Sequence, residues 1–211
     1  MKQRVYQICL LIFFILPTAW AAERHEETYK PVDPPQPTQT GNKIEVIEIF
    51  WYGCPHCYAF EPYVDHWLKS KPDDIEFRRM PAILGKNWIV HAKAYYTAET
   101  LGVLDKIHRP LFDALHKNGE PINDEKRLRK FFIKHGVDGD EFSKIFSSKE
   151  TDDKIKNAFV MGQRYRITGV PAVIINGKYR TSTSVAGSFS NIIDTINQLA
   201  ERERKNATAE E

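Results

Sequence analysis

Two cysteines separated by two residues are the part of this sequence best suited to chemistry. They are Cys54 and Cys57, in the stretch GCPHCY at residues 53–58. A pair with this spacing can bind a metal, cross-link the fold or exchange electrons through a disulfide. The stretch alone leaves all three alternatives open, so the rest of the chain has to decide between them.

Neither a structural metal nor a structural cross-link fits the rest of the chain. A structural zinc site takes about four ligands, and no second pair stands at ligand spacing; His91, His108, His116 and His135 are expected to be surface or packing residues of helices. We therefore expect neither a metal nor a cofactor. A bridge between two such close neighbours closes a very short loop, which removes little entropy from the unfolded chain. Redox chemistry is the alternative that remains.

The N-terminal residues 1–21 have the layout of a secretory signal peptide. Lys2 and Arg4 give a positive start, an apolar run follows at 8–16, and an Ala-Trp-Ala motif supplies the small residues of a cleavage site. The run is shorter than the roughly 18 residues of a spanning helix. Cys9 lies inside the run and is removed with it. We expect an exported protein of the periplasm, a compartment in which disulfides persist.

The charge balance argues against a protein that binds nucleic acid. The sequence has 30 basic and 28 acidic residues. Because Lys2 and Arg4 are the only charged residues in the signal peptide, the exported chain carries 28 of each sign. It also has no basic stripe with interleaved aromatic residues. The exported chain is long enough to bury a substantial core, and it keeps too few cysteines for a disulfide-stapled scaffold.

The local pattern places Cys54 where a strand is followed by a helix. Residues 43–53, KIEVIEIFWYG, form a dense β-prone apolar run, which predicts a strand covered on both faces. The following residues have apolar positions near helical spacing, and Pro55 suits a first helical turn. A helix N-terminus stabilises a thiolate. Cys54 is therefore the predicted nucleophile, and Cys57, one turn deeper, is the predicted resolving thiol.

Three further polar residues near the pair could take part in the exchange. His56 can donate a hydrogen bond or a positive charge to the Cys54 thiolate. Glu48 lies in the middle of the predicted strand, where it is either an edge-strand charge facing water or a buried acid that moves protons during thiol exchange. Glu61 follows Cys57 by one turn and has two similar alternatives, an ordinary helix-face charge or a second buried acid.

A second segment, far downstream, carries a related signal. Residues 167–180 read ITGVPAVIINGKYR, which predicts a short strand followed by a tight hairpin at Asn176 and Gly177. Pro171, preceded by Val170, opens this strand at a position where proline is tolerated. The general frequency of proline isomers predicts an ordinary trans bond there.

These motifs together resemble those of the DsbA family of thiol:disulfide oxidoreductases. The resemblance rests on CPHC, GVPA, the NGKY hairpin and the signal peptide, and it covers nearly all of the exported chain. It implies an α/β, thioredoxin-like fold interrupted by an inserted helical domain. It also implies that Pro171 is cis and lies beside the disulfide, that Val170 offers its backbone to substrate, and that Glu48 and Glu61 are the family's buried acids.

The chain departs from other members of that family just before the cysteine pair. Tyr52 and Gly53 stand where other members carry bulkier aromatic residues. The shape of the surface around Cys54 is therefore expected to differ from theirs.

The predicted function is donation of the Cys54–Cys57 disulfide to reduced or unfolded exported proteins. The resemblance implies reoxidation by a DsbB-like, quinone-linked membrane oxidase. A disulfide isomerase or reductase of the same compartment is an alternative. Isomerases of the DsbC type carry a dimerisation domain before the thioredoxin domain, and the segment before the first strong strand is too short for one, so we expect a monomer. A peptide-binding chaperone with incidental redox chemistry is a third alternative.

The chain is expected to divide into a thioredoxin-like domain and an insertion. A strand at 72–80 ends the first part, and capped or glycine-terminated helical patterns fill the insertion. The proline-rich residues 29–41 are expected to be extended, with their start pairing as an edge strand. The expected parts after the signal peptide are the thioredoxin-like residues 22–81, the helical insertion 82–160, the thioredoxin-like residues 161–205 and a disordered tail 206–211.

Overall fold

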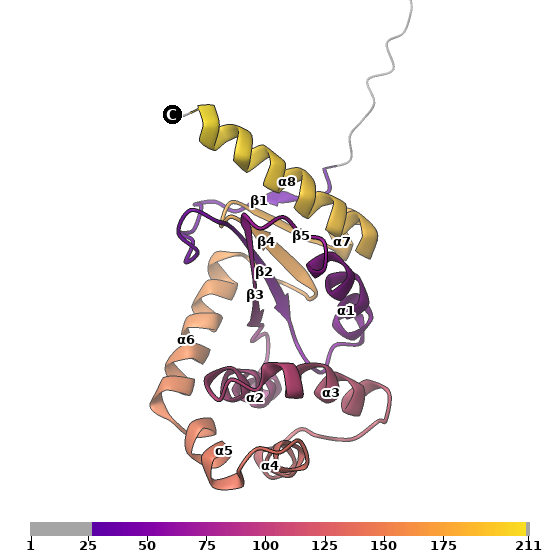
Figure 1. The fold of residues 1–211 in the computed structure, drawn as a ribbon, viewed down its shortest axis with the longest axis vertical. Coiled ribbons are helices and arrows are strands. Elements are labelled where there is room, and N and C mark those ends of the chain that lie inside the picture. The colour runs from indigo at the N-terminus through magenta and orange to yellow at the C-terminus, as the bar shows by residue number, and fades with distance from the viewer. Residues whose placement is uncertain (1–26, 210–211) are drawn as a thin grey trace, which may run out of the picture.

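A computed structural model describes residues 27–209 of the chain (Figure 1). The signal peptide expected at 1–21 lies outside the described residues. Within 27–209, no helix is both long and apolar enough to cross a bilayer. The elements in chain order are β1 Lys30–Pro31, β2 Ile44–Phe50, α1 Pro55–Leu68, β3 Ile75–Pro81, a short 3-10 helix Lys86–Trp88, α2 Ile89–Thr100, α3 Leu104–His116, α4 Glu125–Lys134, α5 Gly139–Phe146, α6 Lys149–Arg164, β4 Ala172–Ile175, β5 Tyr179–Ser182, α7 Thr183–Ala186 and α8 Phe189–Ala209.

The strands form one mixed sheet in the order β1-β5-β4-β2-β3. β2 pairs with β3 in parallel and with β4 antiparallel. A parallel pair needs a crossover connection, which α1 provides. Every residue of β2 is buried, as expected for a strand covered on both faces. Because β2 has a neighbour on each side, the edge-strand alternative for Glu48 is wrong.

Helices cover both faces of this sheet (Figure 1). α1 and α8 pack on one face, where Val46, Phe60 and Ile192 belong to one buried cluster. A second buried cluster joins the C-terminal end of β2 to the helices α2–α6, and both cysteines belong to it. The cysteine pair therefore lies at the junction between the sheet and the inserted helices.

The insertion between β3 and β4 is helical, as predicted. Three of its helices begin at side-chain caps: Asp124 accepts from the Arg127 backbone N–H, Asp138 caps α5 and Ser148 caps α6. The last of them, α6, continues through Arg164, past the boundary expected at residue 160. The insertion therefore returns from α6 to β4 through residues 165–171, which include Val170 and Pro171.

The predicted hairpin between β4 and β5 is confirmed. Asn176 and Gly177 have positive φ angles of 49° and 65°, as a two-residue turn of this kind requires. A Cβ atom at position 177 would lie 2.0 Å from the carbonyl oxygen of Gln36, so no larger residue fits. The predicted edge strand is also present, because β1 pairs antiparallel with β5.

The final helix is longer than the sequence suggested. α8 runs to Ala209, so the expectation of disorder from residue 206 is wrong for 206–209, while residues 210–211 lie outside the described part. Two contacts anchor the helix just before this point: buried Glu203 binds Lys178 at 2.6 Å, and Arg204 makes two hydrogen bonds to Asp74. An anchored helix is extended at low cost, because only nucleation is unfavourable.

Candidate active site

Cys54 lies at the N-terminus of α1, as predicted. It is the N-cap residue, with φ −93° and ψ 116°, and Pro55 opens the helix. The Cys54 side chain is only 8% exposed and Cys57 is fully buried. Both are free thiols, so the structure represents the reduced form of the pair.

The two thiols have opposite acid strengths. The pKa of Cys54 is lowered to about 6, first by a hydrogen bond from the Cys57 side chain, then by the backbone N–H groups of Cys57 and His56 and the charge of His56. Burial raises the pKa of Cys57. Near neutral pH the pair is therefore a thiolate at Cys54 and a thiol at Cys57, which suits one nucleophile and one resolving group.

The segment around Pro171 lies directly against Cys54. The Val170–Pro171 bond is cis, as the family resemblance implies. The Cys54 Sγ atom lies 3.5 Å from the carbonyl oxygen of Val170 and donates to it when the thiol is protonated. Val170 is half-buried and Pro171 is buried, whereas Pro55 and His56 are exposed. The fold thus brings together the two segments that the sequence singled out.

The turn before Cys54 is packed under a pair of tryptophans. The Trp51 and Trp88 rings stack with centroids 4.3 Å apart and planes 9° from parallel. A Cβ atom at Gly53 would lie 2.3 Å from the Trp51 ring, so a side chain at position 53 would displace this stack. The residue between Trp51 and Gly53, Tyr52, is buried. Glycine here allows Trp51 to cover the turn.

Glu48 and Glu61 are both buried acids, and one arginine lies between them. Glu48 is paired in register with Arg79 across β2 and β3. The Arg79 Nε atom lies 2.9 Å from Glu48 Oε2, and Arg79 Nη2 lies 3.3 Å from Glu61 Oε2. Burial raises the pKa of each carboxyl to about 7. The helix-face alternative for Glu61 is therefore wrong.

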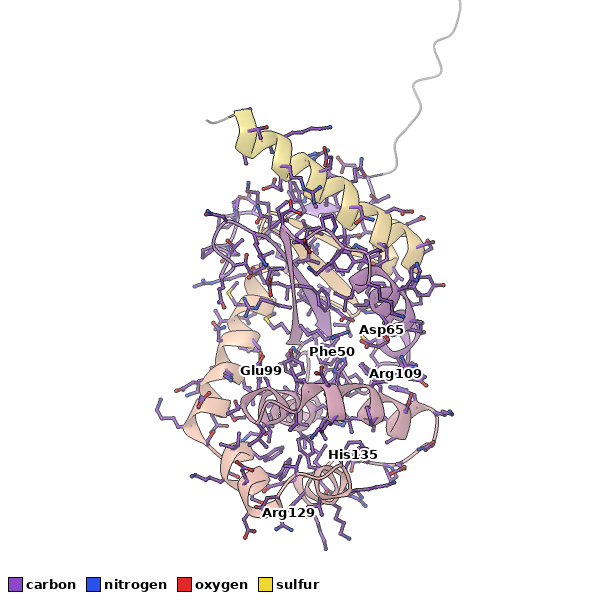
Figure 2. The ribbon with its side chains drawn as sticks, in the orientation of Figure 1. Phe50, Asp65, Glu99, Arg109, Arg129 and His135 are labelled. Carbon is purple, nitrogen blue, oxygen red and sulfur yellow. The ribbon has the colours of Figure 1, made fainter. Side chains whose placement is uncertain are left out.

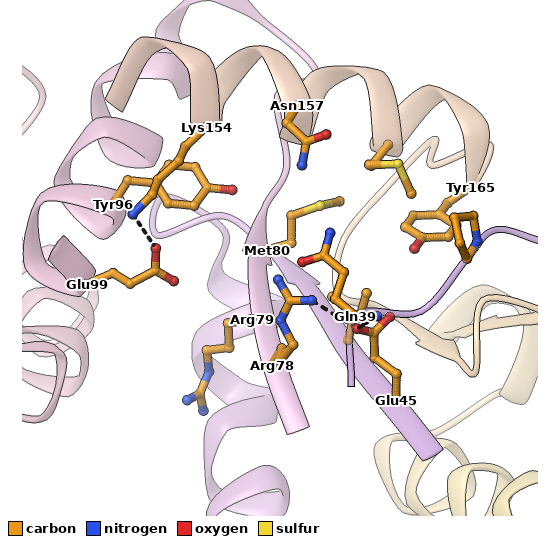
Figure 3. Close-up of a pocket in the computed structure, with 13 residues that line it drawn as sticks. Gln39, Glu45, Arg78, Arg79, Met80, Tyr96, Glu99, Lys154, Asn157 and Tyr165 are labelled. Carbon is orange, nitrogen blue, oxygen red and sulfur yellow. Dashed lines mark hydrogen bonds and ion pairs between the residues drawn. The ribbon is translucent and has the colours of Figure 1, made fainter. Parts of the chain in front are cut away.

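Strand alternation turns the Arg78 side chain away from this buried group and toward a charged pocket, which Arg79 also lines. Arg78 points away from Arg79 (Figure 3), as neighbours on a strand do, and pairs with Glu45 at 2.9 Å. The Arg78 side borders a pocket of about 210 Å³ that also contains the Lys154–Glu99 ion pair. None of the site residues predicted from the sequence lines this pocket.

The sequence interpretation missed two histidines of α3. His108 is buried and its ring lies 2.8 Å from the Tyr52 hydroxyl on one side and 3.3 Å from Glu61 on the other. His116 Nε2 donates to the Tyr52 backbone carbonyl at 2.7 Å. Both residues were expected to be surface or packing residues. They do pack, against Phe112, and they also hold Tyr52, which stands two positions before Cys54.

Across residues 27–209 there is no cluster of three or more histidine, cysteine, aspartate or glutamate residues able to hold an ion.

The fold and the site define a class of protein. A strand that leads into a CxxC pair at a helix N-terminus, with a cis proline packed against the first cysteine, is the arrangement of a thioredoxin-like thiol:disulfide oxidoreductase. Residues 73–196 match the model of the DSBA-like thioredoxin domain. The chain belongs to the DsbA family.

Individual relatives agree with this assignment. The chain is 40% identical over 168 residues to the thiol:disulfide interchange protein DsbA of Azotobacter vinelandii, covering 80% of this chain and 78% of the relative. It is 39% identical to DsbA of Pseudomonas syringae, covering 91% of each chain. The crystal structure of Pseudomonas aeruginosa DsbA superposes with a TM-score of 0.82 at 36% identity, over 86% of this chain and 95% of that one.

The protein is therefore a protein-disulfide oxidoreductase with a mixed α/β thioredoxin-like fold, into which the helices α2–α6 are inserted. Its function is that of the family, the oxidation of thiols in exported proteins.

Proposed function

We propose that Cys54 is the sulfur at which substrates are oxidised and that Cys57 is the resolving thiol. The observation that carries this proposal is the contrast between the two thiols, one with a lowered pKa at a helix N-terminus and one buried with a raised pKa. A stable thiolate favours the reduced enzyme, and it therefore makes the disulfide a strong oxidant.

The exchange proceeds in two steps. A substrate thiolate attacks Cys54 Sγ, the Cys54–Cys57 bond breaks, and Cys57 leaves as a thiolate that takes up a proton. A second substrate thiolate then attacks the substrate sulfur of the mixed disulfide, and Cys54 leaves as the stable thiolate. Two substrate thiols lose two electrons and become a disulfide, and the enzyme gains them as a dithiol.

Glu48 and Glu61 are proposed to serve the proton transfer of the first step. The departing Cys57 sulfur is buried, with a raised pKa, so it needs a proton that bulk water cannot readily deliver. Carboxyl groups whose pKa is near 7 can both give and take protons at neutral pH. His56 and Pro55 act at the exposed start of α1, where they help to stabilise the Cys54 thiolate.

Val170 and Pro171 are proposed to bind the substrate chain beside the reacting sulfur. The Val170 carbonyl faces Cys54, and its backbone is well placed to pair with an extended peptide, as in strand addition. The peptide would then present its cysteine to Cys54 Sγ with its backbone already held.

The setting of the reaction is proposed to be the periplasm, reached through the signal peptide at 1–21. The reduced enzyme must be reoxidised, and a DsbB-like, quinone-linked membrane protein is the partner proposed for this step. We propose that the enzyme acts as a monomer. An isomerase, a reductase and a peptide-binding chaperone are the functions against which this proposal is tested.

The test uses a reduced, unfolded protein substrate whose activity returns only when its disulfides form. The oxidised wild-type protein should restore activity in stoichiometric amounts, and Cys54→Ser should restore none. Cys57→Ser, which keeps the nucleophile, has no disulfide of its own to donate. With oxidised glutathione supplied as the two-electron oxidant, it should accumulate mixed disulfides through Cys54. If Cys54→Ser remained as effective as the wild type, the protein would be acting as a chaperone and the proposal would fail.

A further inference from the structure

Two buried carboxyl groups share a single cation in this protein. Glu48 and Glu61 are almost fully buried, and Arg79 is the one guanidinium that contacts both of them within residues 27–209. Two carboxylates beside one arginine would leave an uncompensated buried charge, which is costly. Around neutral pH the pair therefore holds one proton between its two members. The reaction depends on which carboxyl holds it, since the two groups have different neighbours.

The surroundings of the two carboxyls are unequal. Glu48 accepts from Arg79 through Oε2 only, and its Oε1 atom is buried without a hydrogen-bond partner in the described structure. Glu61 accepts from Arg79 and also lies within 3.3 Å of His108 Nε2. A buried carboxylate oxygen without a donor is unfavourable. The ionised form is therefore better accommodated at Glu61 than at Glu48.

Glu61 also borders a cavity, and Glu48 is not among the residues that line it. The cavity has a volume of about 290 Å³ and lies between α1, β3, α2 and α3, with Glu61, Arg79 and His108 among its lining residues. Asp65 of α1 and Arg109 of α3 line it too, at the boundary between the sheet and the inserted helices (Figure 2). Access to water further favours the charged form of Glu61.

The orientation of the His108 ring is fixed by Tyr52. The Tyr52 hydroxyl lies 2.8 Å from His108 Nδ1, and it has no other hydrogen-bond partner in the part of the chain that the structure describes. Burial raises the pKa of Tyr52, so the phenol keeps its proton and donates it to Nδ1. Burial lowers the pKa of His108 to about 3, so the ring is neutral and carries one proton. That proton is on Nε2, the nitrogen that faces Glu61.

We propose that His108 is a positioning residue that keeps the shared proton on Glu48 by donating its Nε2–H to Glu61. Glu48 lies close enough to Cys57 that its charge, when it is ionised, raises the pKa of the Cys57 thiol. The proton is thus kept on Glu48, which serves the departing Cys57 sulfur, and Glu61 at the cavity stays ionised. The inference rests on the proposed role of the two acids in thiol exchange and deepens it.

The test measures the two carboxyls directly, in the reduced protein without its signal peptide. Glutamate is labelled with ¹³C at Cδ, the two resonances are assigned with Glu48→Gln and Glu61→Gln, and each is titrated by NMR. In the wild type, Glu61 should ionise at lower pH than Glu48. His108→Leu removes the donor, and the Glu61 midpoint should rise by roughly one to two pH units, as expected for a hydrogen bond to a charged group. The order of ionisation should then reverse.

The titration has to be interpreted against every charged or titratable group that faces His108. These are Glu48 on β2, Arg79 on β3, Glu61 and Asp65 on α1, Tyr95 on α2, Arg109 on α3 and Tyr52 in the turn before Cys54.

Conservative variants separate the hydrogen bond from simple packing. His108→Gln keeps an amide donor and should restore the wild-type order. Tyr52→Phe keeps the aromatic ring at position 52 but removes the donor to His108 Nδ1, so the pH interval between the Glu61 and Glu48 midpoints should shrink. This variant provides a test even if His108→Leu does not fold. Phe112→Leu alters packing against the His108 ring, whose centroid lies 5.3 Å away, and should leave the order unchanged.

Two results would overturn the inference. One is a wild-type protein in which Glu48 ionises first. The other is that His108→Leu and Tyr52→Phe both keep the wild-type order of ionisation and the wild-type pH interval between the Glu61 and Glu48 midpoints. Both results are independent of disulfide donation, because the titration needs no substrate. Loss of the inference would therefore leave the roles of Cys54 and Cys57 intact, and the substrate assay tests those roles separately.

Discussion

At the scale of single residues, the chemistry depends on how differently two neighbouring sulfurs hold a proton. The Cys54 pKa of about 6 lies well below the ordinary thiol value of about 8.5. In the reduced protein, the rate of Cys54 alkylation should rise with pH along a curve with its midpoint near 6, followed by mass spectrometry of the modified peptides. Cys57 should stay unmodified over the same range. Equal labelling of the two cysteines at pH 5 would contradict the assignment.

The buried acids should give the folded protein a characteristic dependence on pH. Glu48 has a folded pKa of about 7, above the unfolded value of about 4.3. The folded state therefore binds more protons between these values, and stability falls as pH rises through this range. Glu48→Gln should lose less stability between pH 4.5 and 7 than the wild type does, as measured by urea unfolding at each pH. The same slope in both proteins would mean that Glu48 does not titrate in this range.

The sequence identified the site residues whose partners are close to them in the chain, and it did not identify those whose partners are distant. Cys54, Cys57 and the location of Glu48 follow from a short local pattern of strand, turn and helix. Arg79 and His108 do not, because their roles arise only when β3 and α3 pack against Glu48 and Glu61. Arg79 has no local signal of its own, because β3 reads IEFRRMP and mixes charged with apolar residues, whereas Glu48 stood out within an apolar run.

At the scale of elements, the hairpin between β4 and β5 holds the edge of the sheet. Gly177→Ala should destabilise the protein by more than about 1 kcal/mol, because the residue has a φ of +65° and a Cβ there would meet Gln36. The free energy of unfolding in urea provides the measurement. Gly162→Ala is the matched control, since that glycine lies within α6 with open space around it, and alanine should raise stability by up to about 1 kcal/mol. Equal effects at both positions would refute the turn argument.

The elements themselves were largely predictable, and the exception has a physical cause. The strand before Cys54, the hairpin and the helical insertion each have a strong local pattern. The end of α8 has none, because the helix is extended to Ala209 after Glu203 and Arg204 anchor it to residues distant in sequence. Long-range anchors of this kind cannot be recognised from local composition.

At the scale of the whole molecule, the redox state of two atoms should set the stability of the fold. The Cys54 thiolate is stabilised only in the folded, reduced protein, because its pKa there is lowered. This contribution is fully present above the unfolded pKa of about 8.5 and is lost as pH falls through about 6. The reduced protein should therefore be more stable than the oxidised protein at pH 7. Their difference in unfolding free energy should grow between pH 6 and pH 8.5, as measured by urea unfolding of both forms.

The reduction potential of the Cys54–Cys57 disulfide shows whether the enzyme is a strong oxidant. The protein is equilibrated with glutathione buffers of graded composition, and the reduced fraction is measured after acid quenching and alkylation. At pH 7 the lowered Cys54 pKa raises the potential by roughly 30 mV, because only the interval of about one unit between the pKa of about 6 and the ambient pH stabilises the thiolate, at about 30 mV per unit. We expect a potential above that of the glutathione pool, so that mostly oxidised glutathione still leaves the enzyme reduced. A potential below the glutathione pool, as in a reductase, would contradict it.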